Sequence, residues 1–396
     1  MSYIIDIERL NHNGEGIGKI DNKTIFIPNT IIGDRVKVDI VEEHNNYLRG
    51  NVLEYIDRSS KCINPKCKYY YECGGCHLSN MDYKEQLLYK EDRVKDIFKR
   101  YLNKDIDISV IDSDYKYEYR NKITLQVKDG KIGLYKNRSN DIVEIDKCLL
   151  VSNKINKVIN SLRSYNLSKV NSIVIKESNN EVMLYIDGKI DNNIIDMDVD
   201  TIIINNNVIK GNGYIIQDIN DFRYMVSSKS FYQVNNNVAR KLYDRVVEYA
   251  NLNKDDKVID LYCGTGTIGI YLSKYCEEVL GIEISDSSIK DANKNIKLND
   301  IDNVKFIKGD VGKVINNKYI ASVIIVDPPR SGLDNNTRKV LLEILPKKII
   351  YVSCDTMTLV RDLKDLLNKY ELVNISIADM FPQTYHCESV CILERR

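Results

Sequence analysis

The feature that most constrains the fold is a change of pattern near residue 225, beyond which short apolar strands alternate with helical segments. The helix VNNNVARKLYDRVVEYA comes first, and the strand-like runs that follow it are KVIDLYC, EVLGIEI, VKFIKGD, SVIIVDPP and KKIIYVSC. Parallel strands need crossover connections, so this alternation requires a mainly parallel sheet with helices on both faces. The sequence therefore predicts a doubly wound, Rossmann-like α/β domain over residues 223–396.

The first 57 residues follow a different pattern, in which short β-branched runs are separated by Gly or Asn turns. Five such runs predict a small five-strand barrel: YIIDIERL, NGEGIGKI, KTIFIPNT, DRVKVDIVEE and LRGNVLEYI. Residues 58–222 alternate further strands and turns, which predicts a mostly β central domain. A chain of 396 residues with 43% hydrophobic content can bury several cores. We therefore expect three domains, at residues 1–57, 58–222 and 223–396.

One amphipathic helix is expected inside the central region, over residues 83–102. Its apolar residues recur at helical spacing with charged residues between them, which is typical of a helix that rests on a neighbouring domain. These apolar residues are Leu87, Leu88, Val94, Ile97, Phe98 and Leu102. We expect the helix to pack on the C-terminal domain.

Charge and apolar content limit the classes of partner. The 57 basic and 57 acidic residues balance, so any surface for a nucleic acid must be a local patch. No run of 18 apolar residues occurs and the N-terminus MSYIIDIERL carries charge early, so we expect a cytoplasmic protein with no membrane partner. In that compartment the ten cysteines are expected to be thiols, metal ligands or nucleophiles rather than disulfides.

A glycine-rich turn, DLYCGTGTIG, joins the first strand of the C-terminal domain to a helix. Gly264, Gly266 and Gly269 fit the pattern G-x-G-x-x-G, and Glu283 lies about 20 residues further on. The glycines let the backbone approach a ligand, and the carboxylate can accept hydrogen bonds from ribose hydroxyls. An NAD enzyme and an S-adenosylmethionine enzyme can both use this geometry, so the turn alone leaves the cofactor open.

Three further carboxylates favour S-adenosylmethionine. Asp260 precedes the turn, as an acidic residue does in class I methyltransferases, and Asp310 follows the third strand, where it would suit the adenine edge. Asp327 ends the fourth strand in IIVDPPR, and two prolines then stop that strand abruptly. Such an Asp-Pro-Pro tip resembles the one that methyltransferases direct at a base, and a dehydrogenase gives no reason for it.

Two residues of the C-terminal domain are candidates for covalent chemistry. Cys354 ends the strand KKIIYVSC directly before a helix, and a helix N-terminus favours the thiolate, which is the form that attacks carbon. A buried structural cysteine is the alternative at this position. Glu388 lies between a loop and the last strand, where its carboxylate could face the same cleft.

A second set of cysteines follows metal-ligand spacing. Cys67, Cys73 and Cys76 form C-x₅-C-x₂-C, and Cys148 follows a strand-like segment. Four thiolates of this kind hold zinc or an iron–sulfur cluster, and the spacing does not choose between them. Cys62 is a rival fourth ligand, but we favour Cys148 because Cys62 lies at the entry of the loop. Unligated thiols are the remaining alternative.

Together these segments resemble the RNA uracil-5 methyltransferase family, which makes 5-methyluridine from S-adenosylmethionine. The residues that carry the resemblance are FYQVN at 231–235, DLYCGTGTIG, DPPRSG, YVSC and the final HxES. The N-terminal barrel resembles a TRAM domain, an RNA-binding module of oligonucleotide-binding type. The resemblance implies that Gln233, Tyr262, Gly264, Gly266, Glu283, Asp310 and Asp327 surround the cofactor, with Cys354 as nucleophile and Glu388 as base.

The resemblance also implies a [4Fe–4S] cluster, since some family members carry one on the same cysteine pattern, with zinc as the alternative. Members with both barrel and cluster often act on large-subunit (23S) ribosomal RNA, so that RNA is the expected partner of a monomeric enzyme. The T-loop uridine of transfer RNA is the alternative substrate. One departure from the family is Asp355-Thr356 in place of the usual Asn-Pro after the nucleophile. Asp355 could cap the helix, but its charge would oppose ionisation of the thiol.

Rival functions explain less of the sequence. Cytosine-5 RNA methyltransferases carry a second cysteine after the Asp-Pro-Pro tip, where this chain has Arg330. An NAD oxidoreductase accounts for the glycines but not for Cys354, the barrel or the cysteine set. An RNA-binding module without catalysis would be indicated if no cofactor bound. Because C6 of a stacked uracil is inaccessible, the target base must be flipped out, and Phe231 and Tyr232 are candidates to stack on it, although aromatics before a helix are more often core.

Overall fold

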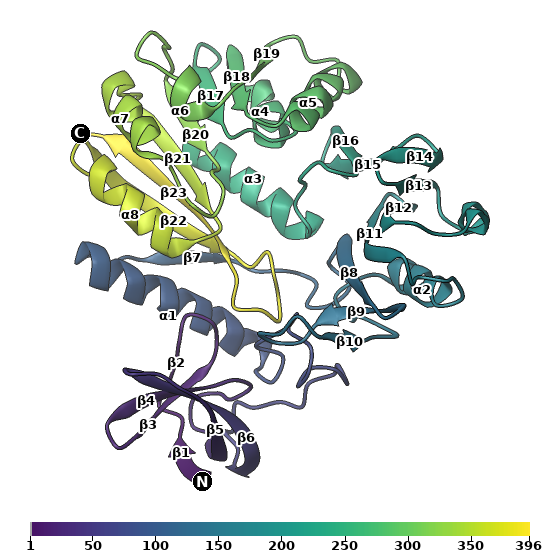
Figure 1. The fold of residues 1–396 in the computed structure, drawn as a ribbon. Helices are drawn as coiled ribbons and strands as arrows, with labels where there is room; N and C mark the ends of the chain where they lie inside the picture. Colours follow the sequence, from purple (N-terminus) through teal and green to yellow (C-terminus); the bar gives the residue numbers. More distant parts are fainter. Residues whose placement is uncertain (1) are drawn as a thin grey trace.

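The computed structural model describes residues 2–396, whose strands form four sheets (Figure 1). A small N-terminal barrel lies at one end, a central sheet lies to one side, and a large mixed sheet flanked by helices carries the C-terminus. Helix α1 (Tyr83–Leu102) runs between the barrel and the large sheet. Among these residues no helix has the length and apolar content needed to cross a bilayer.

The N-terminal barrel has six strands, where five were expected. The first predicted run divides at Ile7 and Glu8, whose N–H groups donate to the carbonyls of Asp34 (2.9 Å) and Ile17 (3.1 Å). The chain thereby crosses from one edge of the sheet, which has the order β1-β5-β6-β4-β3-β2, to the other. The strands are β1 (Ser2–Asp6), β2 (Arg9–Leu10), β3 (Gly16–Ile20), β4 (Lys23–Ile27), β5 (Arg35–Glu43) and β6 (Tyr47–Asp57).

Helix α1 occupies the predicted residues and begins at Asp82, whose side chain accepts a hydrogen bond from the Lys84 N–H. Its buried face contains Val94, Ile97 and Phe98, which belong to the same apolar core as one face of the large sheet. The spacing of apolar residues in the sequence predicted only some of the residues on this buried face. Leu88 is 41% exposed, whereas the polar Gln86 and Lys90 are buried.

The central region forms a seven-stranded sheet in the order β10-β9-β8-β11-β12-β13-β14. Helix α2 covers one face through Ile155, Ile159 and Leu162. The two-stranded ribbon of β15 and β16 follows this sheet in the chain. It contacts the C-terminal domain, where the Met225 N–H donates to Oδ1 of Asn295 (2.7 Å). The elements are β8 (Lys122–Lys128), β9 (Lys131–Tyr135), β10 (Ile142–Glu144), α2 (Asn153–Leu162), β11 (Val170–Ser178), β12 (Glu181–Gly188), η1 (Asn192–Asp196), β13 (Thr201–Ile204), β14 (Asn207–Lys210), β15 (Tyr214–Ile219) and β16 (Phe222–Ser227).

The C-terminal sheet has the order β19-β18-β17-β20-β21-β23-β22-β7. Strands β17 to β21 pair in parallel, β23 pairs antiparallel on both sides, and β7 (Ile108–Ile111) adds an edge strand from the central part of the chain. The remaining elements are α3 (Asn236–Ala250), β17 (Lys257–Leu261), α4 (Thr267–Leu272), η2 (Ser273–Tyr275), β18 (Glu278–Glu283), α5 (Asp286–Leu298), β19 (Val304–Lys308), α6 (Val311–Val314), β20 (Val323–Val326), α7 (Asn335–Ile344), β21 (Lys348–Ser353), α8 (Thr356–Leu366), β22 (Tyr370–Ala378) and β23 (Glu388–Arg395).

Separate apolar cores cover the two faces of this sheet. Alternate residues of one strand point to opposite faces, so Val323 packs with α3 and α4 while Ile324 packs with α1, α7 and α8. The strand order reverses between β17 and β20. In open α/β sheets the carboxyl ends of strands at such a switch point bind ligands, so the candidate site residues are expected at this edge.

Candidate active site

In the glycine turn after β17, one residue has free space beside its backbone. Gly264 (φ +55°) and Gly266 (φ +81°) adopt left-handed conformations, and a Cβ on Gly266 would lie 2.3 Å from Cζ of Phe306. A Cβ on Gly264 would meet nothing within 4 Å. The side chain of Asp260 fixes the turn from inside, because its Oδ2 accepts from the Gly269 N–H (2.9 Å). The turn is therefore rigid on the sheet side and open at Gly264.

Three predicted cofactor residues surround this opening. Glu283 ends β18 and accepts hydrogen bonds from the N–H groups of Gly264 (3.1 Å) and Ser285 (2.7 Å). Tyr262 has φ +63° within the turn. Asp310 caps α6 at the end of the next strand and accepts from the Gly312 N–H. A carboxylate held beside an open backbone can accept hydrogen bonds from ribose hydroxyls.

Buried carboxyl groups gather at the ends of the central strands. Burial raises the pKa of Asp260 to about 8, and the neighbouring charge of Asp327 acts in the same direction. Burial alone raises the pKa of Asp327 to about 7. Burial and Asp327 raise the pKa of Glu388 to about 8, against the opposing cation of Arg330. Each group can therefore exchange a proton near neutral pH.

Strand register brings Cys354 and Glu388 together. Strands β21 and β23 pair antiparallel as far as Ser353 and Ser389. Cys354 directly follows Ser353, and Glu388 directly precedes Ser389, so both candidates adjoin the last residue pair of these strands. Glu388 also acts electrostatically on the thiol. The two candidates for covalent chemistry therefore share one end of the sheet.

The surroundings of Cys354 oppose its ionisation. Burial raises the pKa of this thiol to about 11, and the charges of Glu388, Asp327 and Asp355 add to the shift, while Arg330 lowers the pKa. The expectation that the helix N-terminus favours the thiolate is therefore outweighed here. Asp355 does cap α8, because its Oδ1 accepts from the N–H groups of Met357 (2.9 Å) and Thr358 (3.0 Å), so the sequence predicted both the cap and the direction of its effect.

A cavity of about 160 Å³, which we call the Cys354 cavity, opens beside the thiol. Arg93 of helix α1, Arg330 after the Asp-Pro-Pro tip and His386 near Glu388 line it. Burial lowers the pKa of His386 to about 3, and Arg330 lowers it further. His12 and Asn13 of the barrel also line this cavity. In the sequence His386 stands out only as part of the HxES motif, and no pattern indicates that Arg93, His12 or Asn13 belongs to this site.

The FYQVN segment lies between the C-terminal and central domains. Tyr232 is buried at 8% exposure and packs against Tyr224, whereas Phe231 is 65% exposed. Only Phe231 is thus free to stack on a base. Gln233 is buried and, together with Phe231, lines the cavity that contains the second cysteine set.

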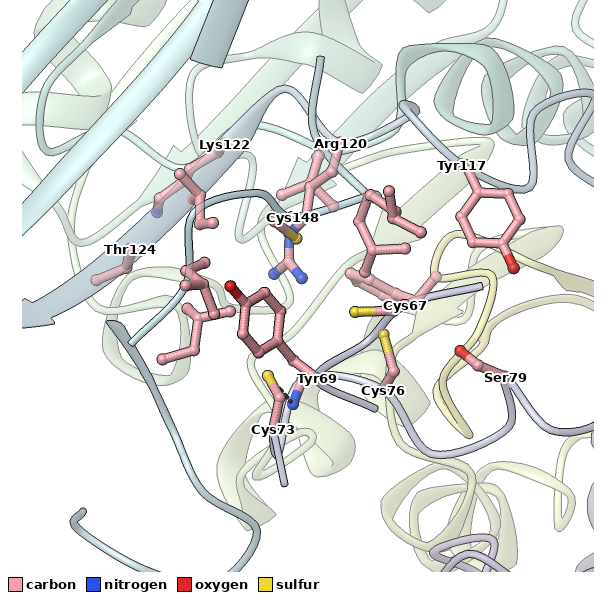
Figure 2. Close-up of a pocket in the computed structure, with 18 of the residues that line it drawn as sticks. Cys67, Tyr69, Cys73, Cys76, Ser79, Tyr117, Arg120, Lys122, Thr124 and Cys148 are labelled. Atoms are coloured by element: carbon pink, nitrogen blue, oxygen red, sulfur yellow. Dashed lines mark hydrogen bonds between the residues drawn. The ribbon is translucent and has the colours of Figure 1, made fainter. Parts of the chain in front are cut away.

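That second cavity has a volume of about 360 Å³, and we call it the four-cysteine cavity because Cys67, Cys73, Cys76 and Cys148 line it (Figure 2). Burial raises the pKa of Cys73 to about 11, and the nearby Cys148 and Cys67 add to the shift. Cys62 lies outside this cavity, and its sulfur accepts a hydrogen bond from Arg58. The structure therefore brings together the four cysteines favoured from the sequence and separates them from the rival.

The charges lining the four-cysteine cavity are all positive. Arg120, Lys122 and Lys147 line it, and no carboxylate does among the residues that the structure describes. Figure 2 shows the guanidinium of Arg120 reaching into the space between the cysteines. Within residues 2–396 no three His, Cys, Asp or Glu side chains converge closely enough to hold one metal ion. Thiolate donors in a cationic, enclosed space suit a group of net negative charge.

Comparison with protein families matches two parts of the chain. The model of a family described as tRNA (uracil-5-)-methyltransferase matches residues 188–396, and the TRAM-domain model matches residues 3–53. The chain is 34% identical to an uncharacterized RNA methyltransferase of Clostridium tetani (strain Massachusetts / E88), over 99% of this chain and 96% of that protein. It is 35% identical to an uncharacterized RNA methyltransferase of Caldanaerobacter subterraneus subsp. tengcongensis, over 99% and 98%.

Among solved structures the chain is similar to the tRNA (uracil-54, C5)-methyltransferase of Pyrococcus abyssi in complex with S-adenosyl-L-homocysteine. The two share 27% identity with a TM-score of 0.82, over 98% of this chain and 99% of that chain. Similarity over nearly the whole of both chains confirms the predicted fold class: a doubly wound methyltransferase domain, a central β-rich domain and an N-terminal TRAM barrel.

Proposed function

Because the chain belongs to the tRNA (uracil-5-)-methyltransferase family and is an RNA (uracil-5-)-methyltransferase, we propose that Cys354 and Glu388 carry out its reaction as nucleophile and base. The observation that carries this proposal is that both residues adjoin Ser353 and Ser389, the last pair of strands β21 and β23, and that the charge of Glu388 acts on the thiol. Both act electrostatically with Asp327, which directly follows β20 and whose N–H donates to the carbonyl of Leu261 at the end of β17. A thiol, a proton acceptor and a cofactor site therefore meet at one edge of the sheet.

S-adenosylmethionine is the methyl donor, and when bound it supplies an electrophilic methyl group. We propose that the open backbone at Gly264, in the turn that the left-handed conformation of Gly266 helps to form, holds its adenosine part together with the carboxylate of Glu283 and the side chain of Asp310. The fit rests on the open position at Gly264 and on the carboxylate of Glu283 that the turn itself orients. Gln233, Tyr262 and Asp327 are the further contacts that we assign to the cofactor and the reacting base.

The nucleophile is needed because C5 of uracil is too weakly nucleophilic to accept a methyl group by itself. The Cys354 thiol first loses its proton to solvent. The thiolate then adds to C6, and the electron pair of the C5–C6 double bond moves onto C5 as an enolate. After C5 is methylated, Glu388 removes the C5 proton. The electron pair of that C–H bond restores the double bond and expels the Cys354 thiolate. Protonated Glu388 then returns its proton to solvent.

The four-cysteine cavity supports a second proposal, a [4Fe–4S] cluster held by Cys67, Cys73, Cys76 and Cys148. A cluster of this type with four thiolates carries a net negative charge, which Arg120, Lys122 and Lys147 would balance. The volume of about 360 Å³ also leaves room for a group larger than one ion. Zinc is the alternative, and it would require the four sulfurs to close to about 3.8 Å from one another, from its tetrahedral geometry and Zn–S distance.

We propose 23S ribosomal RNA as the substrate, since the TRAM barrel and the cysteine set occur together in this chain. A T-loop uridine of transfer RNA is the second candidate. The observation that favours it is the similarity, across 98% of the chain, to the Pyrococcus abyssi tRNA (uracil-54, C5)-methyltransferase.

The experiment that tests the function is methylation of defined RNAs by the purified protein. With labelled S-adenosylmethionine, 23S ribosomal RNA transcripts should acquire label, and nucleoside analysis should identify 5-methyluridine. Transfer RNA from the same source is assayed in parallel, and label there alone would select the second candidate. Label recovered as 5-methylcytidine, or binding of NADH without any response to S-adenosylmethionine, would contradict the proposal.

A further inference from the structure

A loop of the TRAM barrel forms part of the wall of the Cys354 cavity. Residues 11–15 connect β2 to β3 at the end of the barrel nearest α1 (Figure 1). His12 and Asn13 have exposed side chains, and both line the same cavity as Cys354, Arg330 and His386. The barrel therefore reaches the reacting thiol, whereas an RNA-binding module could have been attached at a distance from it.

This loop is fixed by its own hydrogen bonds. Oδ1 of Asn11 accepts from the N–H groups of Asn13 (2.8 Å) and Glu15 (3.0 Å), and its Nδ2 donates to the Glu15 carboxylate (2.7 Å). Glu15 is buried and pairs with Arg138 of the central domain (2.5 Å). Gly14 has φ +75° and packs so closely that a Cβ would lie 2.8 Å from Leu78. The loop is thus ordered before any ligand binds, and its tip carries two free polar side chains.

Helix α1 holds the loop against the catalytic domain through the loop backbone. The Tyr89 hydroxyl donates to the carbonyl of Asn11 (2.7 Å), and one turn later Arg93 donates to the carbonyl of His12 (3.0 Å). The other terminal nitrogen of Arg93 lies 3.2 Å from the sulfur of Cys387, the residue before Glu388. These contacts use backbone carbonyls of the loop, so the side chains of His12 and Asn13 do not hold it in place.

From this geometry we infer that His12 and Asn13 bind the ribose–phosphate linkage that adjoins the target uridine in the Cys354 cavity. This inference rests on the proposed role of Cys354. Besides the imidazole of His386, the wall supplies the imidazole of His12 and the amide of Asn13, which can hydrogen-bond to hydroxyl and phosphate oxygens. It also carries two guanidinium groups, Arg93 and Arg330. Asp355 is the only carboxylate lining the cavity within the described residues, and its Oδ1 is already engaged as a helix cap. Such a surface suits an anionic, hydroxyl-bearing ligand.

The ligand assignment can be tested by changing single atoms of the RNA. A substrate with 2′-deoxyribose on either nucleotide next to the target, and one with a methylphosphonate at either flanking linkage, are compared with unmodified RNA. The wild-type enzyme should lose about three- to tenfold in kcat/KM for at least one modification, as expected for one hydrogen bond. His12→Ala with Asn13→Ala should show the same loss with unmodified RNA and no further loss with the modified RNA.

His44→Ala provides the matched control, because His44 lies in another turn of the barrel and does not line the Cys354 cavity. It should keep the full sensitivity of the wild type to the modified RNAs. The inference is overturned if the double variant methylates unmodified RNA as efficiently as the wild type, or if it remains sensitive to every modification. Failure of wild-type enzyme to be trapped by RNA containing 5-fluorouridine would instead contradict the role of Cys354, so the two proposals fail in distinguishable ways.

Discussion

The protein places cysteine thiols in two cavities that differ in the carboxyl groups near the sulfur. In the four-cysteine cavity, Arg120, Lys122 and Lys147 accompany the thiols and no carboxylate lines the wall among the described residues. At Cys354 a single thiol faces the charges of Glu388, Asp327 and Asp355, with Arg330 as the opposing cation. Burial raises the pKa of Cys73 and of Cys354 alike to about 11. The several thiols and cations of the first cavity suit a group bound by several thiolates, whereas the second site has a single thiol with carboxyl groups near it.

This difference separates two functions that residue type alone does not distinguish. A metal-binding cysteine must stay ionised, so cations and the metal itself compensate its charge. A cysteine that acts as a nucleophile must also leave at the end of the reaction. It therefore does not need to stay ionised throughout, as a metal ligand does. Carboxyl groups with pKa values near neutrality beside Cys354 provide proton acceptors for that cycle. The predictions below alter one cavity at a time.

The largest effect is expected from Cys354→Ala. The variant lacks the sulfur that we propose as the nucleophile, so methylation should fall by at least about a thousandfold, while binding of S-adenosylmethionine and RNA is kept. Trapping with 5-fluorouridine RNA measures the same step, because fluorine at C5 cannot leave as a proton. The wild-type adduct should survive denaturing electrophoresis and map to the peptide that contains Cys354. An adduct on Cys263, Cys387 or Cys391 would place the nucleophile elsewhere.

Glu388→Gln should separate methyl transfer from product release. The amide cannot accept the C5 proton, so one turnover should transfer the methyl group and leave the RNA covalently bound to Cys354. The adduct should therefore accumulate on ordinary uridine RNA, without 5-fluorouridine. Glu394→Gln, at the other end of the same strand, is the control and should turn over normally. Multiple turnovers by Glu388→Gln would assign the base to another group.

Removing one thiol from the four-cysteine cavity should affect metal content more than the chemistry at Cys354. Protein purified without oxygen should be brown, with iron and sulfide in near-equal amounts. Cys148→Ala should lose most of this iron, and Cys62→Ala should keep it, because Cys62 lies outside the cavity and interacts with Arg58. Colourless wild-type protein with stoichiometric zinc would reject the cluster. Retention of iron in Cys148→Ala would transfer the fourth ligand to another residue.

The sequence predicted best the residues whose positions follow from strand alternation. Glu283 ends β18, and Asp327 and Cys354 directly follow β20 and β21. Parallel strands collect their carboxyl ends at one edge of the sheet, so the proximity of these residues could be predicted without a structure. To predict that Cys354 and Glu388 lie near each other, one would also have to know the antiparallel register of β21 and β23. That register is a consequence of packing and was not visible in the spacing.

Residues from other domains could not be predicted in this way. His12 and Arg93 reach the Cys354 cavity because α1 docks the barrel against the catalytic domain, and periodicity carries no information about docking. Gln86 and Lys90 are polar residues on the buried face of α1. Gln86 bonds both ways with Gln383, and Lys90 pairs with Asp379 (2.5 Å). Both partners belong to the loop before Glu388, so tertiary hydrogen bonds and not apolar burial determine that side of the helix.

The smallest expected effect concerns the charge beside the nucleophile. The Cys354 pKa is raised to about 11, so the thiolate fraction, and with it the rate of adduct formation on 5-fluorouridine RNA, should rise with pH throughout the range below that value. Asp355→Asn keeps an oxygen that can accept from Met357 and Thr358 but removes one charge that opposes ionisation. The profile should move to lower pH, and the rate at pH 7.5 should rise about two- to fivefold, as for a partly exposed charge.

Asp82→Asn, which alters the cap of α1 in the same way, should leave the profile unchanged. Equal profiles for Asp355→Asn and the wild type would mean that burial and the carboxylates of Glu388 and Asp327 alone determine the ionisation of the thiol.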